Sequence, residues 1–237
     1  MTVQELGKIL LCNTPDFEYH GKWYTIDWMD GQFPDIKLYF IPFNCGEDEV
    51  QEFDGFDDLH YSEGILLEAQ NALSRMYGTR KSFFSVNGST AGLLTAISAS
   101  VKKGGQILVA RNCHKAVYHA IYLRELVPTY IYPQSDNDLG INGSISVSRV
   151  ERCLEENPKI EAVLITSPTY DGVVSDVRKI AETAHRHGIP LIVDEAHGAH
   201  FRFSNYFPVS AADLGADVVI QSFHKTLPAM TQTAVLH

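Results

Sequence analysis

The lysine at position 225 has neighbours that could take part in chemistry. It closely follows the apolar run Asp217-Val218-Val219-Ile220, with Ser222 and His224 beside it. A lysine amine can form a Schiff base with an aldehyde, while hydroxyl and imidazole groups can bind phosphate. A surface lysine would need no such setting. Lys225 is therefore a candidate covalent catalyst.

The same stretch also spells Ser-x-x-Lys, a motif of the serine acylases. In that class the motif opens a helix and precedes a Ser-Asp-Asn, whereas here it follows a strand-like run and comes after the Ser135-Asp136-Asn137 of "QSDND". In addition, "KTL" stands where that class requires Lys-Thr-Gly. These differences in order and context exclude the serine-acylase interpretation.

A second candidate is the aspartate in "IPLIVDEAHGAH", where Asp194 stands at the carboxyl end of an apolar run. A carboxylate there meets little water, so it requires a metal ion, a backbone donor or a cationic ring nitrogen as its partner. Asp194, His197 and His200 are all possible zinc ligands, but the loose His-x-x-His spacing without a further ligand cluster disfavours a metal, and we expect none. A structural aspartate that caps the next turn is the remaining alternative.

A third candidate is "SVNGSTAGLL", where a strand-like run meets Gly88 and then a helix that Ser89 or Thr90 would cap. Free backbone N–H groups at a helix start, next to a glycine, can bind a phosphate. A plain capped helix after a tight turn is the alternative for this stretch alone. The similar loop in "ITSPTYDGVVSD", with a helix capped near Ser175, could be a simple connection.

The elements that must position these residues alternate regularly along the chain. Apolar runs typical of strands are "SFFSV", "QILVA", "VPTYIYP", "EAVLIT", "IPLIVDEA" and "ADVVIQS". Helix-period stretches lie at about 61–77, 89–103, 114–125, 146–157 and 176–187. This order predicts an α/β fold with a mostly parallel sheet flanked by helices. Such sheets bind ligands beyond the carboxyl ends of their strands, where all the candidate residues lie.

Composition bounds the class of protein. The 237 residues are 45% hydrophobic with a formal charge of −10, which is typical of a globular chain and disfavours nucleic-acid binding. The four cysteines have no C-x-x-C spacing, and the N-terminus resembles neither a signal peptide nor a membrane span. We expect a cytoplasmic protein without a membrane partner. Residues 1–60 show no sustained period, which indicates an irregular N-terminal arm before a large domain at 61–237.

A phosphate cradle, an aspartate at a strand end and a lysine after the next strand together describe a pyridoxal-phosphate site. The sequence also resembles the ornithine/lysine/arginine decarboxylases, a branch of the fold-type-I pyridoxal-phosphate enzymes. The resemblance covers about residues 57–237 and is carried by "FFSVNGSTAG", "ARNCHKAVYHA", "ITSPTYDGVVSD", "IPLIVDEAHGAHF" and "LGADVVIQSFHKTLPAMTQTAVLH". It implies the large domain of such an enzyme.

The resemblance also implies roles for individual residues. Lys225 would carry the cofactor as a Schiff base, Asp194 would face the pyridine nitrogen, and His114 would stack on the ring. An ionised Asp194 would keep that nitrogen protonated, which makes the ring an electron sink. The other cofactor-binding residues implied are Gly88, Ser89, Thr90, Ser222 and His224 around the phosphate, with Ala196 and His197 at the ring.

The expected activity is pyridoxal-phosphate-dependent decarboxylation of lysine, ornithine or arginine, as in polyamine biosynthesis, by a homodimer. The alternatives are another fold-type-I reaction, such as transamination or a lyase reaction, and an inactive fragment that acts only through its interface. The sequence reads "IPFNCGEDEV" where the family has Pro-Gly-His-Lys, and it stops inside an apolar run without the family's smaller carboxyl-terminal domain. We therefore expect a truncated, open site that is inactive alone, and an unpaired sheet edge at the last strand.

Overall fold

A computed structural model describes residues 17–19, 22–24, 57, 61–136 and 138–237. The chain divides into two compact units, residues 1–76 and 77–237. In the first unit, β1 (Phe17–Tyr19) pairs antiparallel with β2 (Lys22–Tyr24), and α2 (Ile65–Tyr77) begins after Asp57, whose carboxylate accepts backbone N–H groups at the start of the helix. The predicted arm at 1–60 lies almost entirely outside the described residues, so the arm and its boundary stay predictions.

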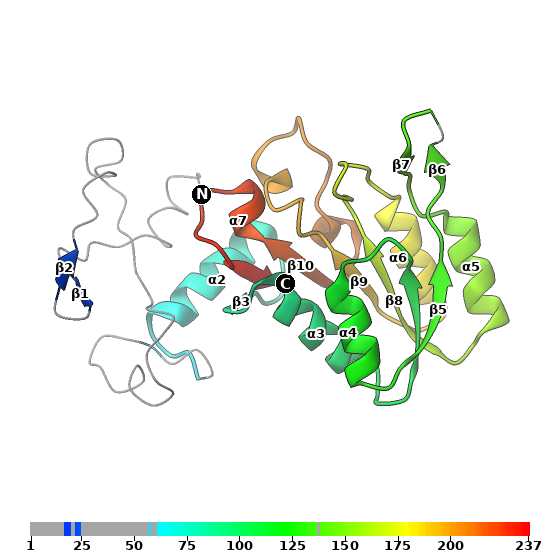
Figure 1. Cartoon of the computed structure of the whole chain (residues 1–237), viewed down its shortest axis with the longest axis horizontal. Helices are drawn as coiled ribbons and strands as arrows, with labels where there is room; N and C mark the ends of the chain where they lie inside the picture. Colours follow the sequence, from blue (N-terminus) through cyan, green and yellow to red (C-terminus); the bar gives the residue numbers. More distant parts are fainter. Residues whose placement is uncertain (1–16, 20–21, 25–56, 58–60, 137) are drawn as a thin grey trace. The chain divides into compact units, whose positions relative to one another are not determined.

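The second unit is built on one mixed sheet (Figure 1). Its spatial order is β3-β11-β10-β9-β8-β4-β5. The pairs from β10 through β9, β8 and β4 to β5 are parallel, and only β11 runs against its two neighbours. The strands are β3 (Phe83–Ser85), β4 (Gln106–Ala110), β5 (Val127–Ile131), β8 (Ile160–Thr166), β9 (Leu191–Asp194), β10 (Val218–Ser222) and β11 (Ala234–Leu236). The predicted mostly parallel α/β sheet is confirmed, and all six predicted strands form.

The five predicted helices also form, as α2 and four helices that pack on the sheet. These four are α3 (Gly88–Ser100), α4 (Lys115–Leu123), α5 (Val147–Glu156) and α6 (Val177–Arg186). Shorter elements are the hairpin β6 (Ser135–Asp136) and β7 (Ile141–Asn142), the 3-10 turns η1 (Phe201–Phe203) and η2 (Ala211–Leu214), and α7 (Phe223–Thr226).

One predicted helix cap was wrong, and a second was confirmed. The N-cap of α3 is Asn87, not Ser89 or Thr90, because the chain enters this helix two residues before Ser89, through Gly88 at φ +66°. Such a backbone conformation costs glycine little and leaves both hydroxyl residues inside the first turn. The cap predicted near Ser175 is confirmed: the N-cap of α6 is the next residue, Asp176, whose carboxylate accepts the N–H of Lys179.

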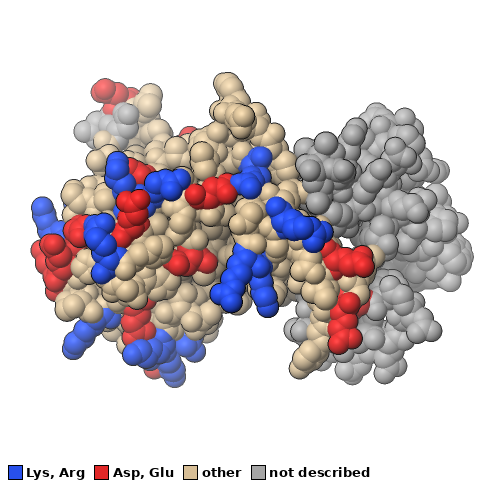
Figure 2. All heavy atoms as spheres, turned by 180° about the vertical axis from the view of Figure 1, so that it is seen from behind, with Lys and Arg blue, Asp and Glu red and all other residues tan. Residues whose placement is uncertain are grey.

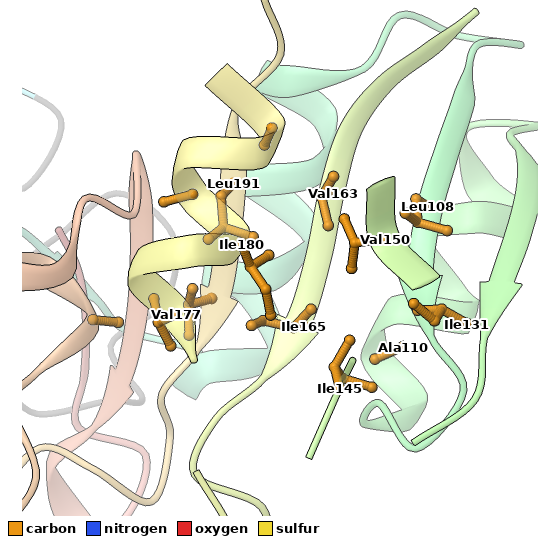
Figure 3. Close-up of a cluster of buried hydrophobic side chains, with 14 of the residues drawn as sticks. Leu108, Ala110, Ile131, Ile145, Val150, Val163, Ile165, Val177, Ile180 and Leu191 are labelled. Carbon is orange, nitrogen blue, oxygen red and sulfur yellow. The ribbon is translucent and has the colours of Figure 1, made fainter. Parts of the chain in front are cut away.

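Apolar side chains fill both faces of the sheet. On one face, residues of the strands pack against α5 and α6, and Figure 3 shows Val150, Val177 and Ile180 directed at strand residues such as Val163 and Ile165. On the other face, Ile107, Val109, Leu164, Ile192 and Ile220 pack against α3 and α4. Because helices cover both faces, the sequences of the central parallel strands are continuous apolar runs, without the alternation of apolar and polar residues found in strands with one exposed face.

The unpaired edge expected at the last strand was wrong. β11 lies inside the sheet, where Leu236 pairs with Ile220 of β10 on one side and with Phe83 of β3 on the other. The apolar run at the end of the sequence therefore has backbone partners on both sides, because β3, from the start of this unit, pairs alongside it.

Charges of both signs are scattered over the surface. Figure 2 shows Lys and Arg side chains interspersed with Asp and Glu over the described part of one face, without a continuous field of either sign. Within the described residues, no helix is both long and apolar enough to span a membrane.

Candidate active site

The carboxyl ends of β9 and β10 bring the predicted site residues to one edge of the sheet. Asp194 is the last residue of β9, and Ser222 is the last residue of β10. Lys225 follows in α7. The segment that contributes Ser89 is more than a hundred residues away in sequence, yet it reaches the same edge through the first turn of α3.

Two hydroxyl groups meet where a phosphate was expected to bind. The Oγ atoms of Ser89 and Ser222 lie 2.5 Å apart, although 133 residues separate them in the chain. Gly88 is buried at the start of the same helix, where an added Cβ would lie 3.8 Å from the carbonyl oxygen of Gln232. Backbone N–H groups in the first turn of a helix lack intrahelical partners and attract anions. This pair of serines, the serine pair, is suited to a phosphate.

The other two residues predicted around the phosphate are placed differently. Thr90 follows Ser89 in the first turn of α3, with an exposed side chain. His224 turns its Nδ1 to the carbonyl oxygen of Thr233, at 3.0 Å. That bond orients the ring of His224 against the turn that precedes β11, so its phosphate role stays a prediction.

Asp194 is a buried carboxyl group with one backbone donor. Its Oδ1 accepts the N–H of Ala196 at 3.2 Å, and the residue is 3% exposed. Burial raises the pKa of Asp194 to about 6, against the opposing effects of the Ala196 N–H and the charge of Lys225. A buried carboxylate in this state gains from a further positive partner.

Lys225 is exposed at the surface of the site and contacts a histidine. Its Nζ lies 3.2 Å from Nε2 of His197, and the ring of His197 packs edge-on against Tyr170 at 5.6 Å. Burial, followed by the charges of Lys225 and His114, lowers the pKa of His197. A neutral imidazole can accept a hydrogen bond from the lysine through Nε2, which holds the end of Lys225 near the turn that carries Asp194.

His114 is fixed by a cap at the start of α4. Its Nδ1 accepts the N–H of Ala116 at 3.2 Å, so a neutral ring carries its proton on Nε2. Burial lowers the pKa of His114, and the charge of Lys225 lowers it further. The residue is therefore a neutral imidazole oriented by its cap bond, and its stacking role stays a prediction.

Glu195 is a buried acid that the sequence analysis did not single out. Adjacent residues of a strand face opposite sides, so Glu195 points away from Asp194 into the other face. Its carboxylate accepts Ser210 Oγ at 2.7 Å, the Ala211 N–H at 2.7 Å and Gln221 Nε2 at 2.6 Å. Burial raises the pKa of Glu195 to about 7, although these donors oppose the shift. The sequence feature that could have identified Glu195 is its position directly after Asp194 at the end of a predicted strand.

A chain of hydrogen bonds continues behind Glu195. Because the Gln221 amide nitrogen donates to Glu195, its Oε1 must accept from Nε2 of His237, at 3.2 Å. Nδ1 of His237 then accepts from Ser82 Oγ at 2.8 Å, and burial lowers the pKa of His237 to about 3. The network joins the ends of β9, β10 and β11, and it holds Gln221 directly before Ser222.

Unsatisfied polar atoms are concentrated at this edge of the sheet. Within the described part of the chain, five buried side-chain polar atoms have no hydrogen-bond partner. Four of them lie at or after the carboxyl ends of strands: Asn112 Oδ1 after β4, Thr166 Oγ1 at the end of β8, His200 Nδ1 after β9 and Thr226 Oγ1 after β10. Buried polar groups normally find partners, so this edge fits a polar ligand.

A metal ion fits the described residues less well. Among them, no group of three or more His, Cys, Asp and Glu side chains is arranged to hold one. Asp194 and His197 have a backbone N–H and a lysine amine as neighbours instead. A carboxylate, an amine and a pair of hydroxyl groups suit an organic phosphate with a basic ring nitrogen.

Comparisons with known proteins show which family the chain is part of. A family model described as "Orn/Lys/Arg decarboxylase, major domain" matches residues 35–237. The chain belongs to the Orn/Lys/Arg decarboxylase family. It is 36% identical to an arginine decarboxylase of Bacillus subtilis over 87% of this chain and 42% of that protein. It is 28% identical to the lysine decarboxylase LdcA of Pseudomonas aeruginosa over 73% of this chain and 26% of that protein.

Solved structures of this decarboxylase family and beyond share the fold. Lysine decarboxylase A from Pseudomonas aeruginosa aligns with a TM-score of 0.66 at 27% identity, over 74% of this chain and 26% of that one. The pyridoxal-5'-phosphate dependent protein YhfS from Escherichia coli aligns with a TM-score of 0.57 at 14% identity, over 70% and 42% of the two chains. The fold is that of the large domain of fold-type-I enzymes, and the chain spans less than half the length of these relatives.

Proposed function

We propose that this decarboxylase-family protein binds pyridoxal phosphate and removes the carboxyl group of a basic amino acid. The observation that carries the proposal is the meeting of the serine pair with Asp194 and Lys225 at one edge of the sheet. The relatives named arginine decarboxylase and lysine decarboxylase support a basic substrate. A homodimer in the cytoplasm remains a prediction.

Each proposed role follows from the position of a side chain. The serine pair and the start of α3 would hold the phosphate, and Lys225 would hold the cofactor covalently through Nζ. When bound, the cofactor supplies an electron sink for the bond that loses carbon dioxide. Asp194, as a carboxylate, would hold a proton on the ring nitrogen by charge. His114 would orient the ring by stacking, which contributes about 0.5–1.5 kcal/mol beyond buried area.

The proposal is tested by locating the cofactor and by measuring the product. The purified chain is incubated with pyridoxal phosphate, reduced with borohydride, digested and mapped. We expect the label on Lys225; a label on Lys115 or Lys179 would contradict the assignment. Because we expect residues 1–237 to be inactive alone, the product is measured with an enzyme that carries this chain as its large domain. Release of carbon dioxide from carboxyl-labelled arginine, lysine and ornithine identifies the reaction, whereas formation of a keto acid would indicate transamination.

Removing either hydroxyl of the serine pair is expected to weaken cofactor binding. Hydrogen bonds to a charged group contribute about 1.5–3 kcal/mol, so Ser89→Ala and Ser222→Ala should each raise the dissociation constant of pyridoxal phosphate about 10-fold or more. Because the two oxygens lie 2.5 Å apart, the double variant should lose less than the sum of the single losses.

The controls for the serine pair use a ligand and a distant residue. Pyridoxal, which lacks the phosphate, should bind the variants and the wild type equally well. Ser148→Ala, in α5 on the other side of the unit's core, should leave the affinity for pyridoxal phosphate unchanged. Equal losses for pyridoxal and for pyridoxal phosphate would show that the serines support the fold of the site rather than the phosphate.

A further inference from the structure

Glu195 lies behind the site and receives hydrogen bonds from two other segments. The residue is 1% exposed, and its carboxylate accepts Ser210 Oγ and the Ala211 N–H at the start of η2. It also accepts Gln221 Nε2 of β10. All three partners are neutral donors, and burying a carboxyl group among neutral partners costs more than burying an apolar side chain. Packing alone would therefore favour an apolar residue at this position.

One of these bonds leads to the serine pair. Gln221 reaches Glu195 on one side of the sheet, so the next residue, Ser222, faces the other side. There Ser222 Oγ meets Ser89 Oγ. The side chain of Gln221 is fully buried and its amide is held at both ends, by Glu195 and by Nε2 of His237. Because Gln221 and Ser222 are adjacent in β10, anchoring the amide fixes the backbone that carries the hydroxyl.

Little space remains around the side chain of Glu195. A Cβ added at Gly198 would lie 2.6 Å from Cγ of Glu195 and 3.2 Å from its Cδ, closer than carbon atoms pack. The N–H of Gly198 donates to the carbonyl oxygen of Glu195 at 2.9 Å, which closes the turn between the two residues. A branched side chain at position 195 would disturb this turn, so a fair test uses an unbranched side chain of similar length.

The hydrogen bonds beyond Gln221 have a direction that the carboxylate sets. A carboxylate only accepts, so Gln221 donates to it, and His237 in turn donates through Nε2 to Gln221 Oε1. Nδ1 of His237 then accepts from Ser82 Oγ, which lies 2.9 Å from Thr79 Oγ1. An amide in place of the carboxylate would donate to Gln221 instead, and the bonds could be remade only in the opposite direction. The Gln221 amide would turn over, and the proton of His237 would move to Nδ1.

We propose that Glu195 is a positioning residue of the cofactor site, which through Gln221 holds Ser222 in place for the phosphate. The inference rests on the proposed function and adds to it a residue that acts from behind the sheet, because Glu195 faces the side opposite Asp194. The position requires a side chain that keeps a hydrogen bond to Gln221, in either direction.

Glu195→Met tests whether the bond to Gln221 positions Ser222. Methionine is unbranched like glutamate but carries no oxygen, so Gln221 loses its anchor. The dissociation constant of pyridoxal phosphate should rise about 10-fold, the effect of one hydrogen bond to a charged group. Pyridoxal, which lacks the phosphate, should bind the variant and the wild type equally well. Gln221→Met breaks the same link while Glu195 keeps its other two bonds, and it should cause the same selective loss.

A double variant separates positioning from general support of the fold. If Glu195 acts through Ser222, Glu195→Met should weaken binding of pyridoxal phosphate by less than about 2-fold in a Ser222→Ala background, because the hydroxyl that it positions is already gone. Two independent losses would instead multiply to about 100-fold. Such a product would show that Glu195 supports the site only in general, and it would overturn the positioning role.

Glu195→Gln is the conservative variant, and it reports on the direction of the hydrogen bonds. Burial raises the pKa of Glu195 to about 7 and lowers the pKa of His237 to about 3, so at pH 8 the carboxyl group is ionised and the ring is neutral. Nitrogen-15 NMR of the ligand-free chain should show the ring proton on Nε2 in the wild type and on Nδ1 in the variant. Affinity for pyridoxal phosphate should stay within about 3-fold of wild type, because Gln221 keeps a partner. An unchanged tautomer in the variant would show that residue 195 does not set the direction, and would overturn the inference.

The matched control is Glu151, whose carboxylate accepts Arg186 Nη2 and Thr183 Oγ1 between α5 and α6. Glu151→Gln should leave the tautomer of His237 and the affinity for pyridoxal phosphate unchanged. A wild-type chain that binds no pyridoxal phosphate would overturn the proposed function and this inference with it. A wild-type chain that binds it, with Glu195→Met losing affinity equally for pyridoxal phosphate and pyridoxal, would overturn the role of Glu195 alone.

Discussion

In an enzyme that carries this chain as its large domain, Lys225→Ala is expected to abolish covalent cofactor binding and to lower carbon dioxide release by at least about 10³-fold. The variant loses the amine that would hold the cofactor, and with it a group able to transfer a proton, a contribution that alone reaches about 10²–10⁴-fold. Borohydride reduction followed by peptide mapping checks the first effect, and single-turnover release from labelled substrate checks the second.

The control for Lys225 is another exposed lysine of the same unit. Lys179→Ala removes an exposed side chain that pairs with Asp176 at the start of α6, which packs on the opposite face of the sheet from α3 and α4. In the same longer enzyme, it should leave labelling and release at wild-type levels. If Lys225→Ala retained a covalent label and near wild-type release, the lysine of the proposed mechanism would have to be sought elsewhere in the chain.

Asp194→Asn is expected to lower the rate of decarboxylation by about 10²–10³-fold, the loss typical of removing one preorganised electrostatic group. The amide has the shape of the carboxyl group but no charge to hold a proton on the ring nitrogen. Affinity for pyridoxal phosphate should fall much less, because the serine pair and Lys225 remain. A variant with near wild-type turnover would remove Asp194 from the mechanism.

The same substitution should stabilise the ligand-free chain at neutral pH. Burial raises the pKa of Asp194 from 3.8 to about 6, so the folded state binds a proton more readily than the unfolded state does. Stability contributed by the protonated carboxyl is therefore present below pH 4 and is lost as the pH rises through about 6. This difference between the folded and unfolded pKa of Asp194 corresponds to about 3 kcal/mol in the free energy of unfolding.

Thermal unfolding at several pH values checks this sign. The difference in melting temperature between Asp194→Asn and the wild type should be near zero at pH 4 and reach several degrees above pH 7. Glu195, His237 and His197 also titrate differently on folding, but they are common to both proteins and cancel in the difference. A pH-independent difference would show that the charge of Asp194 is not the cause.

Much of the fold could be predicted from local patterns. The six apolar runs and five helix-period stretches predicted the correct types of element, since the central strands bury both faces and the helices on the sheet bury one. The cap of α6 was predicted to within one residue, whereas the cap at Asn87 was missed, because the start of α3 depends on the backbone angles at Gly88. The pairing of β11 inside the sheet was also missed, because neighbouring strands need not be neighbours in sequence.

For the site, the sequence by itself determined which chemical groups are available: a lysine, an aspartate and two serines, each just beyond a strand or at a helix start. It could do so because strand ends and helix starts are local features. Only the tertiary structure decided that Ser89 and Ser222 meet at 2.5 Å, that Glu195 faces away from Asp194 into its own network, and that Thr166 stands unpaired beside Asp194. These contacts join segments 26 to 133 residues apart, and they depend on sheet order, register and burial, which no local stretch of sequence specifies.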